Sequence, residues 1–523
     1  MKKLSFILAL VIALTGMIGL FATPAYAADA TTLEVGEGKT YATIGAALAA
    51  TGETGSYVIE VYNNTNETVI DHVLGEGKSV TIRSAGETSY AVNITPADDT
   101  SDSKNTVDSQ KYHGWFIMTG GTVVIDNLDV TVNQNGSSAG NYCLVYFVNT
   151  AAGYGNVVID KANIVTYGRC ILVGATAGVH AGTTVNISIS NSTMTSTASK
   201  IFVQFNNRKA GAIANINLTN VGFADGVANA LLSNAETLTF NAVNCYSLPG
   251  TKLAYGFNSS GTKYGTINFI NCEYNIGNYL AANSTGSGNV SEINVYSGTY
   301  NTSDKGIQNN SATAKVNIYG GTFTSTSANG FIMGASTKAY FYGGTIDAAL
   351  PFNTNNAGQQ ATGIQAITDG TKTTYVPEGI TVDTTLLSAK GAQIVNGTTS
   401  ESASTSIRLV FQIKATEAEL ANYSAIGVWA SKSNSTVMDL GDLNAQAKVT
   451  VLPTTTTVYT SVNADGVVVE AAEGYYYILV EISNISNANF ADVIYVRPYV
   501  VAADGTTVTA GDAYVTSVNS FLK

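Results

Sequence analysis

The chain has little charge, little proline and few of the residues that build metal or nucleophilic sites. Only 12% of its 523 residues are Asp, Glu, Lys or Arg, and it holds 7 prolines, 4 cysteines and 3 histidines. The 37 acidic residues outnumber the 25 basic ones, giving a formal charge of −12 at pH 7, which argues against nucleic acid as a partner. The histidines are isolated, with no cysteine at metal-ligand spacing, so the sequence gives no basis for a zinc site.

Long apolar runs are also scarce, and the one that exists lies at the start of the chain. Lys2 and Lys3 precede an apolar stretch that ends in small residues around Ala27, which predicts a secretory signal peptide over residues 1–27. No later run approaches the ~18 residues that a membrane-spanning helix needs. We therefore expect a protein that is secreted or held at the cell surface, with no membrane span.

The sequence is rich in copies of one short repeat, seen as VVIDNLDV, INLTNVGF, INFINCEY and VNIYGGTF. Apolar residues alternate with polar ones in each copy, which is typical of a strand with one buried face. We align the copies, 22 to 34 residues apart, on one predicted buried column: Ile125, Ile159, Ile189, Leu218, Phe240, Phe269, Val295, Ile318 and Phe341.

Two residues after each of these anchors the sequence predicts a corner. Most corner residues are Asn or Gly, which take left-handed backbone angles readily. The predicted corner residues are Asn127, Lys161, Asn191, Asn220, Ala242, Asn271, Ser297, Gly320 and Gly343. Short strands separated by such corners stack as parallel coils with a rung spacing of ~4.8 Å, so the fold class is an all-β solenoid.

The start of the mature chain supports this interpretation and carries a resemblance. An Ala-rich run from Ala42 to Ala50 follows a Tyr-x-Thr pattern, and GKSVTIRSAG comes soon after. This opening resembles the right-handed parallel β-helix proteins of the pectin-lyase-like superfamily, and the VNIYGGTF repeat is similar to that of large surface proteins of Gram-positive anaerobes. The resemblance implies a right-handed parallel β-helix over 28–397 with an N-terminal capping helix. It says little about activity, because this fold serves lyases, hydrolases, esterases, adhesins and spacers.

The composition changes after the repeats. A polar stretch at 398–406 predicts a linker, and alternating strand patterns over 407–523, with a tight turn at Asp504 and Gly505, predict a small antiparallel β-sandwich module.

Candidate catalytic groups are few. The resemblance implies calcium-binding Asp clusters with an Arg base in lyases, or paired Asp residues in hydrolases, and neither motif is present. The nearest constellation is Asp126 and Asp160, which directly follow the anchors of adjacent coils. Carboxylates stacked at ~5 Å repel each other unless a cation lies between them. Two interpretations stay open, a calcium site or two solvated side chains.

Tyrosines occupy this same outward position in three later coils. Tyr296, Tyr319 and Tyr342 are spaced evenly, and Tyr340 lies on the neighbouring outward position. Such a strip suits the apolar faces and hydroxyls of sugars. The alternative is that the tyrosines pack under a loop or under the C-terminal module.

The four cysteines divide into two pairs by their position in the repeat. The alignment stacks Cys143 on Cys170 in the core and places Cys245 and Cys272 two positions out of register. Buried thiols and a strained Cys143–Cys170 disulfide are the two interpretations.

These observations favour a non-enzymatic surface or secreted β-helix that binds polysaccharide or cell-wall glycan, or acts as an adhesin or structural spacer. The alternative is a polysaccharide lyase or glycoside hydrolase that acts on an acidic glycan with a non-standard site. No cofactor is expected beyond the calcium alternative.

Overall fold

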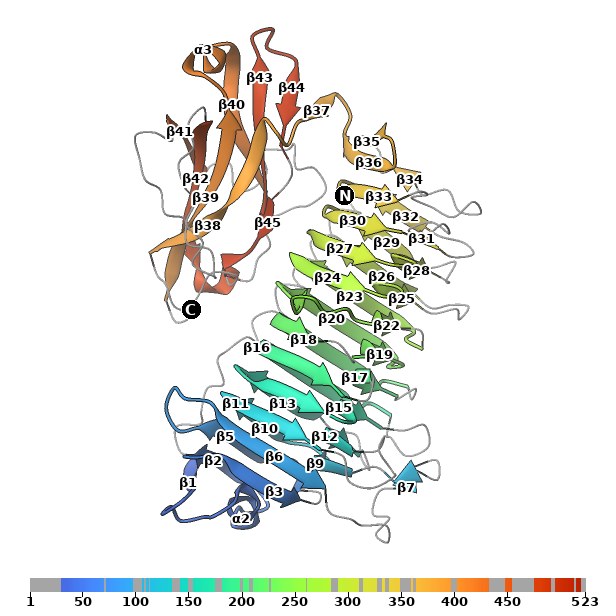
Figure 1. Cartoon of the computed structure of the whole chain (residues 1–523), viewed down its shortest axis with the longest axis vertical. Helices are drawn as coiled ribbons and strands as arrows, with labels where there is room; N and C mark the ends of the chain where they lie inside the picture. Colours follow the sequence, from blue (N-terminus) through green and yellow to red (C-terminus); the bar gives the residue numbers. More distant parts are fainter. Residues whose placement is uncertain are drawn as a thin grey trace.

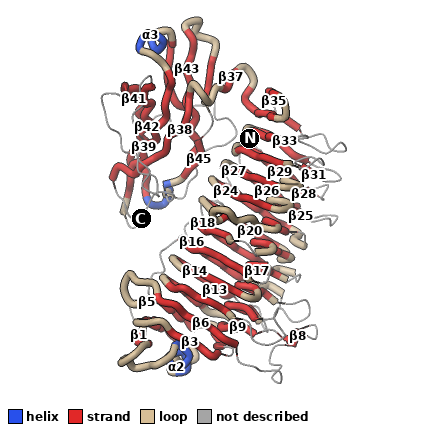
Figure 2. The backbone as a smooth tube through the Cα atoms, in the orientation of Figure 1, coloured by secondary structure: helices blue, strands red, loops and turns tan. Residues whose placement is uncertain are grey.

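A computed structural model describes most of the chain after the predicted signal peptide, which lies outside the described residues. The described ranges are 30–69, 72–96, 106–107, 110–111, 113–133, 142–148, 154–174, 181–197, 201–206, 210–224, 227–259, 261–283, 290–309, 314–326, 332–333, 338–348, 359–360, 364–396, 402–431, 447–453, 475–490, 494–511 and 514–518. The fold is nearly all strand, as Figure 2 shows.

The first part is a parallel β-solenoid, as the repeats predict (Figure 1). Its first face stacks one strand per rung in parallel register, up to a short last strand that pairs with β32. The strands of this face are β1 (Thr31–Val35), β2 (Gly55–Val61), β5 (Lys78–Ser84), β10 (Thr122–Asp126), β13 (Tyr154–Asp160), β16 (Thr184–Ser196), β18 (Ile213–Phe223), β20 (Thr237–Val243), β23 (Tyr264–Ile270), β26 (Val290–Val295), β29 (Lys315–Ile318), β32 (Lys338–Phe341) and β34 (Gln359–Gln360).

The second face follows the corner, and β16 and β18 run through the corner onto it. Its other strands are β3 (Thr65–Val69), β6 (Tyr90–Pro96), β11 (Leu128–Val132), β14 (Asn163–Thr166), β21 (Tyr246–Ser247), β24 (Cys272–Ile276), β27 (Gly298–Thr302), β30 (Thr322–Ser325) and β33 (Thr345–Ala348). An antiparallel hairpin, β35 (Ile364–Asp369) and β36 (Lys372–Pro377), pairs with β33 at the last rung.

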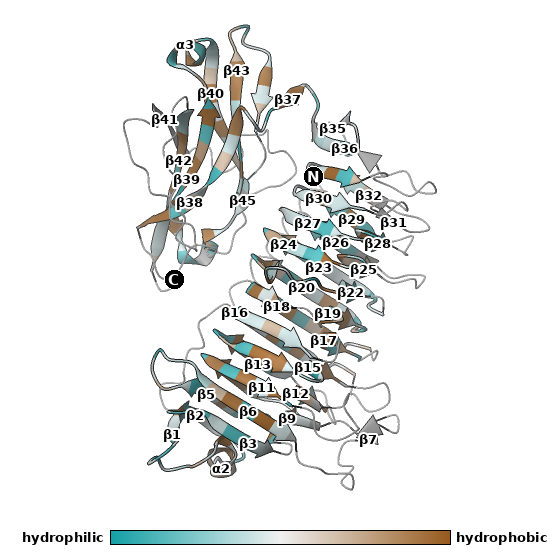
Figure 3. Cartoon of the chain, viewed as in Figure 1, coloured by the Kyte–Doolittle hydropathy of each residue, from teal (hydrophilic) through white to brown (hydrophobic). Residues whose placement is uncertain are grey.

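The third face is a separate sheet of ten strands. These are β4 (His72–Leu74), β9 (His113–Met118), β12 (Tyr142–Phe147), β15 (Arg169–Val173), β17 (Ile201–Phe205), β19 (Asn229–Ser233), β22 (Tyr255–Ser259), β25 (Ala281–Asn283), β28 (Ile307–Asn309) and β31 (Ile332–Met333). A small antiparallel pair, β7 (Thr106–Val107) and β8 (Gln110–Lys111), stands apart. The three faces enclose one continuous apolar core, and Figure 3 shows apolar residues recurring across successive rungs.

A short helix, α2 (Ile44–Ala49), packs at the N-terminal end of this core. Thr43 caps it by accepting from the backbone N–H of Ala46, and Ile44 and Leu48 are buried in the solenoid core. The buried carboxylate of Glu67 accepts from the backbone N–H groups of Ile44 and Gly45, which stabilises the positive end of the helix.

The corners are built as the sequence predicts in the early rungs and at Asn271, and are displaced elsewhere. In the last three rungs the positive φ lies on Gly298, Gly321 and Gly344, one residue after the predicted Ser297, Gly320 and Gly343. Left-handed φ angles of 46° to 54° occur at Asn127, Lys161, Asn191, Asn220, Asn244 and Asn271. The predicted corner Ala242 is instead the buried anchor, paired with Leu218 and Phe269, while Phe240 pairs with Ile216. The predicted column was therefore two residues out of register at Phe240, because the larger apolar residue was aligned instead of the asparagine that turns the chain.

The C-terminal module is two sheets around a second core. One sheet contains β38 (Leu387–Asn396), β39 (Ser404–Lys414), β42 (Tyr475–Ser486) and β41 (Ala447–Pro453). The other contains β37 (Ile380–Val382), β44 (Val508–Ala510), β43 (Ile494–Ala502), β40 (Tyr423–Ser431) and β45 (Tyr514–Thr516). Two short helical turns, α3 (Glu417–Leu420) and η1 (Asn487–Asn489), connect strands of the module.

The module begins earlier than the predicted boundary at 397. Strand β37 pairs with β44, and β38 pairs with β39 across the predicted linker, so residues from Ile380 to Asn396 belong to the module sheets. The alternating pattern of these residues fits either a last coil or a sandwich strand, and only the pairing partner distinguishes the two. In Figure 1 the module lies beside the later rungs of the solenoid.

Candidate functional site

One outward column of side chains changes character along the solenoid. We call it the outward column; it consists of the residue that follows the anchor in each rung. Its first half is polar, with Glu60, Arg83, Asp126, Asp160, Ser190 and Thr219 in register. Its second half is apolar or aromatic, and consists of Val243, Ile270, Tyr296, Tyr319 and Tyr342.

The three tyrosines of the outward column are held in line by the backbone ladder. The N–H groups of Tyr296, Tyr319 and Tyr342 donate to the carbonyl of the anchor in the preceding rung, at 2.8 to 2.9 Å. The rings stack on each other, with centroids 5.0 Å apart at 9° for Tyr296 and Tyr319 and 4.8 Å apart at 22° for Tyr319 and Tyr342. Because ring faces contact ring faces, the column presents ring edges to an approaching ligand.

Strand β43 of the C-terminal module packs against this column. Tyr495 lies 6.2 Å from Tyr296, centroid to centroid, and forms an apolar cluster with Tyr296 and Ile270. Tyr296 is only 9% exposed, and burial raises the pKa of its hydroxyl well above the usual range. Tyr319, Tyr342 and Tyr340 are half-buried. The predicted strip is thus assembled, but Tyr296 serves the contact with the module.

The alternation along β43 explains how the module reaches the solenoid. Ile494 and Val496 belong to the core of the module, whereas Tyr495 and Arg497 point to the opposite face of the strand. Tyr495 and Arg497 are nevertheless only 4% and 5% exposed. Arg497 lies near the solenoid corner, with one guanidinium nitrogen 4.0 Å from the position that a Cβ atom on Gly343 would occupy.

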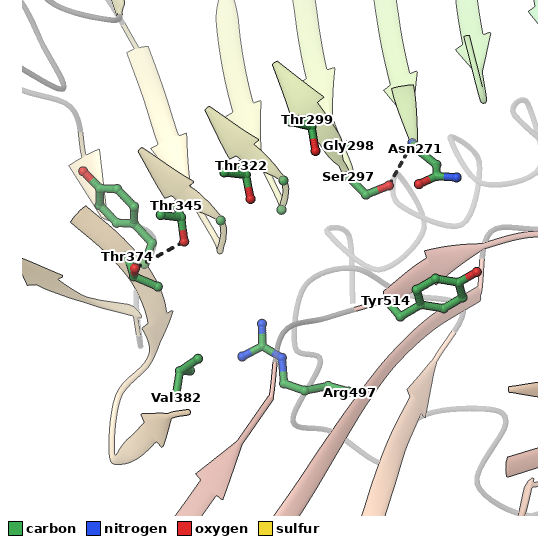
Figure 4. Close-up of a pocket in the computed structure, with 14 residues that line it drawn as sticks. Asn271, Ser297, Gly298, Thr299, Thr322, Thr345, Thr374, Val382, Arg497 and Tyr514 are labelled. Atoms are coloured by element: carbon green, nitrogen blue, oxygen red, sulfur yellow. Dashed lines mark hydrogen bonds between the residues drawn. The ribbon is translucent and has the colours of Figure 1, made fainter. Parts of the chain in front are cut away.

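A cavity of about 210 Å³ remains at this seam between the solenoid corner and the module. Its solenoid side carries one threonine per rung, with Thr299, Thr322 and Thr345 in register. Its module side carries Arg497 and Tyr514. Figure 4 shows the threonine side chains on the side of the strands that faces Arg497. We call this space the seam cavity; sequence reasoning missed it because its two walls are about 200 residues apart in the chain.

Asp126 and Asp160 lie on adjacent rungs in register, as expected. Asp160 accepts from the Ser190 hydroxyl at 2.6 Å and from the Asn191 amide at 3.0 Å. Both neighbours act as donors toward one carboxylate oxygen, whereas calcium needs six to eight oxygen ligands. The described residues contain no group of three or more His, Cys, Asp and Glu side chains placed to hold a metal ion. This arrangement of Asp126 and Asp160 does not fit a calcium ion.

Asparagine ladders account for much of the remaining polar surface. Asn241, Asn268, Asn294 and Asn317 each donate an amide N–H to the side-chain oxygen of the asparagine one rung earlier, at 2.7 to 2.9 Å. In the sequence these residues are marked by an Asn that directly precedes the buried anchor, and no ladder was predicted from this pattern. Because these amides bond to each other, the ladder stabilises the sheet and leaves little amide capacity for a ligand.

A second hollow, of about 230 Å³, lies over the first face. It is lined by Thr122, Asn156, Asn186 and Asn215, whose side chains bond along the rungs at 2.9 to 3.0 Å, and by neighbouring residues of the same strands. No charged side chain is among the residues that line it. This hollow offers few directional groups for chemistry.

The cysteines are all buried, and no disulfide joins them. Cys143 pairs with Arg169 rather than with Cys170 and packs outside the main core with Ile117, so the predicted stacking of Cys143 on Cys170 is wrong by one residue. The register correction at Ala242 brings Cys245 level with Cys272 on the next rung. Both of these thiols belong to the solenoid core.

Comparison with known proteins adds no assignment: no family model, curated protein or solved structure matches the chain. Among the described residues, no helix is long and apolar enough to cross a membrane.

Proposed function

We propose that the chain is a secreted or cell-surface β-helix protein that binds polysaccharide without transforming it, at the tyrosines of the outward column beside the C-terminal module. The observation that carries the proposal is the stacked column of Tyr296, Tyr319 and Tyr342 next to a hydroxyl-lined cavity. The tyrosine hydroxyls of this rigid row, and the threonine hydroxyls on the far side of the solenoid corner, each recur once per rung. They therefore offer hydrogen-bonding groups at a regular spacing.

Rigidity supports binding of a regular polymer. Backbone ladders fix the positions of Tyr319 and Tyr342, so these residues lose little freedom when a ligand binds. Tyr340 lies on the adjacent outward position, in register with Asn317, and widens the open end of the strip. Tyr296 anchors the module instead and is not counted among the binding residues.

A binding role fits the chemistry of the site better than catalysis does. Hydrolysis of a glycoside needs two carboxyl groups that flank the scissile bond. Asp160 of the aligned pair accepts hydrogen bonds from Ser190 and Asn191. The seam cavity is lined by hydroxyls, backbone and Arg497, without a carboxylate among its lining residues.

The test is a pull-down of the mature protein with insoluble polysaccharides, followed by a glycan array. The double variant Y319A/Y342A should bind roughly thirtyfold more weakly, at about 1 kcal/mol per ring. The matched control is Y154A, because Tyr154 is 50% exposed on another part of the first face. Unchanged binding by a well-folded double variant would contradict the proposal.

The enzymatic alternative is tested in parallel. Release of unsaturated uronate or of reducing ends from acidic polysaccharides is measured with and without calcium. Turnover by the mature protein that an Asp160→Asn variant abolishes would replace the binding proposal with a catalytic one.

A further inference from the structure

The seam cavity contains a charged side chain in an unusual position. Arg497 is the charged residue among the 14 that line the cavity, and it is 5% exposed although it lies on the outer face of β43. The guanidinium group carries a planar fork of N–H donors that matches carboxylate and sulfate oxygens in pairs. Away from bulk water such charge-assisted hydrogen bonds are stronger than at an open surface.

The opposite wall supplies neutral donors in a regular array. Thr299 and Thr322 are exposed and in register on successive rungs, and the Thr345 hydroxyl lies 3.2 Å from that of Thr374. These hydroxyls can donate or accept. They therefore suit the hydroxyl groups of a sugar, while Arg497 suits a negative substituent on it.

Glycines line the floor of the cavity. Gly321 and Gly344 have φ angles of 101° and 92°, which favour glycine. At the position that Asn220 occupies in its rung, the rungs beside the cavity carry Gly320 and Gly343, which place no side chain there. The volume of about 210 Å³ lies below the ~300–1,000 Å³ of pockets for drug-sized ligands. It fits a single substituted ring better than an extended chain.

We propose that the seam cavity binds one sugar ring that carries an oxyanion, a carboxylate or a sulfate ester, with Arg497 as the residue that recognises the charge. This inference rests on the proposed function, because it assumes a glycan ligand, and it adds the chemical class that the glycan must carry. It also gives the C-terminal module a role, since β43 supplies the cationic wall of the cavity.

Calorimetric titration of the full mature chain with sodium glucuronate, glucose 6-sulfate, glucose and inorganic sulfate tests the proposal. At least one charged sugar should bind at least about tenfold more tightly than glucose. Whether glucuronate or glucose 6-sulfate binds more tightly decides between a carboxylate and a sulfate ligand. Added NaCl should weaken the binding of the charged sugar, because salt screens its attraction to Arg497. Equal affinity for glucose and both charged sugars would overturn the inference, as would binding of inorganic sulfate as tight as that of glucose 6-sulfate.

Variants locate the site. R497Q should weaken the charged sugar at least about tenfold and leave glucose unchanged, whereas R497K should show an intermediate loss because it keeps the charge and loses the fork. The matched control is R408Q, since Arg408 is a module arginine paired with Glu481 at 2.9 Å. An affinity of R497Q for the charged sugar equal to that of the parent protein would contradict the proposal.

A second variant keeps the test valid if R497Q disturbs the seam. T322V removes one exposed hydroxyl from the solenoid wall and should weaken both sugars severalfold without altering thermal unfolding; unchanged affinity in T322V would also contradict the site. The two proposals separate cleanly. If Y319A/Y342A loses polysaccharide binding while R497Q binds glucuronate and glucose 6-sulfate normally, the oxyanion inference fails and the proposed function stands.

Discussion

At the scale of single residues, the corner asparagines carry more information than the apolar residues beside them. Asn244 has a φ of 53° and fixes the register of its rung, whereas Phe240 is a buried aromatic that fits either of two inward positions. A small anchor such as Ala242 has no signal of its own in the hydrophobic pattern. Aligning the repeats on the turning residue, rather than on the largest apolar one, would have placed Cys245 level with Cys272.

The corner residue Lys161 is an exception that gives a direct test. It holds a φ of 49° where the neighbouring rungs use Asn127 and Asn191, and a left-handed angle costs a side chain such as lysine ~1 kcal/mol more than glycine. K161N should therefore raise the free energy of unfolding by about 0.5 kcal/mol or more. Chemical denaturation checks this, with K161A as the control that should bring no gain; a lower stability of K161N would contradict the strain argument.

The anchor column predicts a severe effect at Phe269, which is fully buried between Ala242 and Val295. F269D places an unpaired charge in the core, and a loss of several kcal/mol should follow. F269L keeps the apolar character and should cost about 1 kcal/mol. Secreted yield and thermal unfolding are the measurements, and normal stability of F269D would disprove the register.

The buried thiols make a prediction about pH. Burial raises the pKa of Cys143 to about 12 and raises the pKa of Cys170 well above its usual range. In the unfolded chain a thiol ionises near ~8.5, so the folded state binds more protons above that pH. Stability from these groups should be fully present below about pH 8.5 and decline as the pH rises toward 12. A thiol reagent at pH 8 should label all four cysteines only after unfolding; rapid labelling of the native protein would contradict their burial.

At the scale of elements, the ladders show how polar residues stabilise a parallel sheet. Asn268 is 1% exposed, donates to Asn241 at 2.7 Å and accepts from Asn294 at 2.9 Å. The sequence predicted the strands and the solenoid, because their periodicity is local. It did not predict the ladders, since stacking of amides depends on register across rungs.

The middle of the ladder is therefore the sensitive point. N268A leaves one buried acceptor and one buried donor without their amide partner, at a cost of roughly 2–4 kcal/mol. The control is N301A, because Asn301 donates to Asn275 at 3.0 Å on an exposed position, and it should cost within about 0.5 kcal/mol. Equal unfolding midpoints for the two variants would show that burial of the ladder contributes nothing.

At the scale of the whole molecule, the C-terminal module packs on the part of the outward column that is apolar or aromatic. The column is charged or polar from Glu60 to Thr219 and apolar from Val243 onward, and Tyr495 packs on this second part. The sequence indicated both the tyrosines and a module, and it left open whether the two meet. The contact depends on two segments about 200 residues apart, which no local pattern connects.

This docking is the last property that the structure makes testable. Tyr495 is on the outer face of β43, so Y495A should leave the module core of Ile494 and Val496 intact while it removes the ring that packs on Tyr296. Loss of a buried aromatic contact costs about 1 kcal/mol or more, and the remaining seam includes a cavity lined by threonines and Arg497. We therefore expect the module to separate from the solenoid in a measurable fraction of molecules, seen as a larger radius of gyration in small-angle scattering.

A double-mutant cycle with Y296A should show coupling, because the two rings form one contact. Y264A, on an exposed solenoid tyrosine, should leave the radius unchanged. If Y495A has the same radius as the parent, the module is held by other contacts, and the walls of the seam cavity do not depend on this ring.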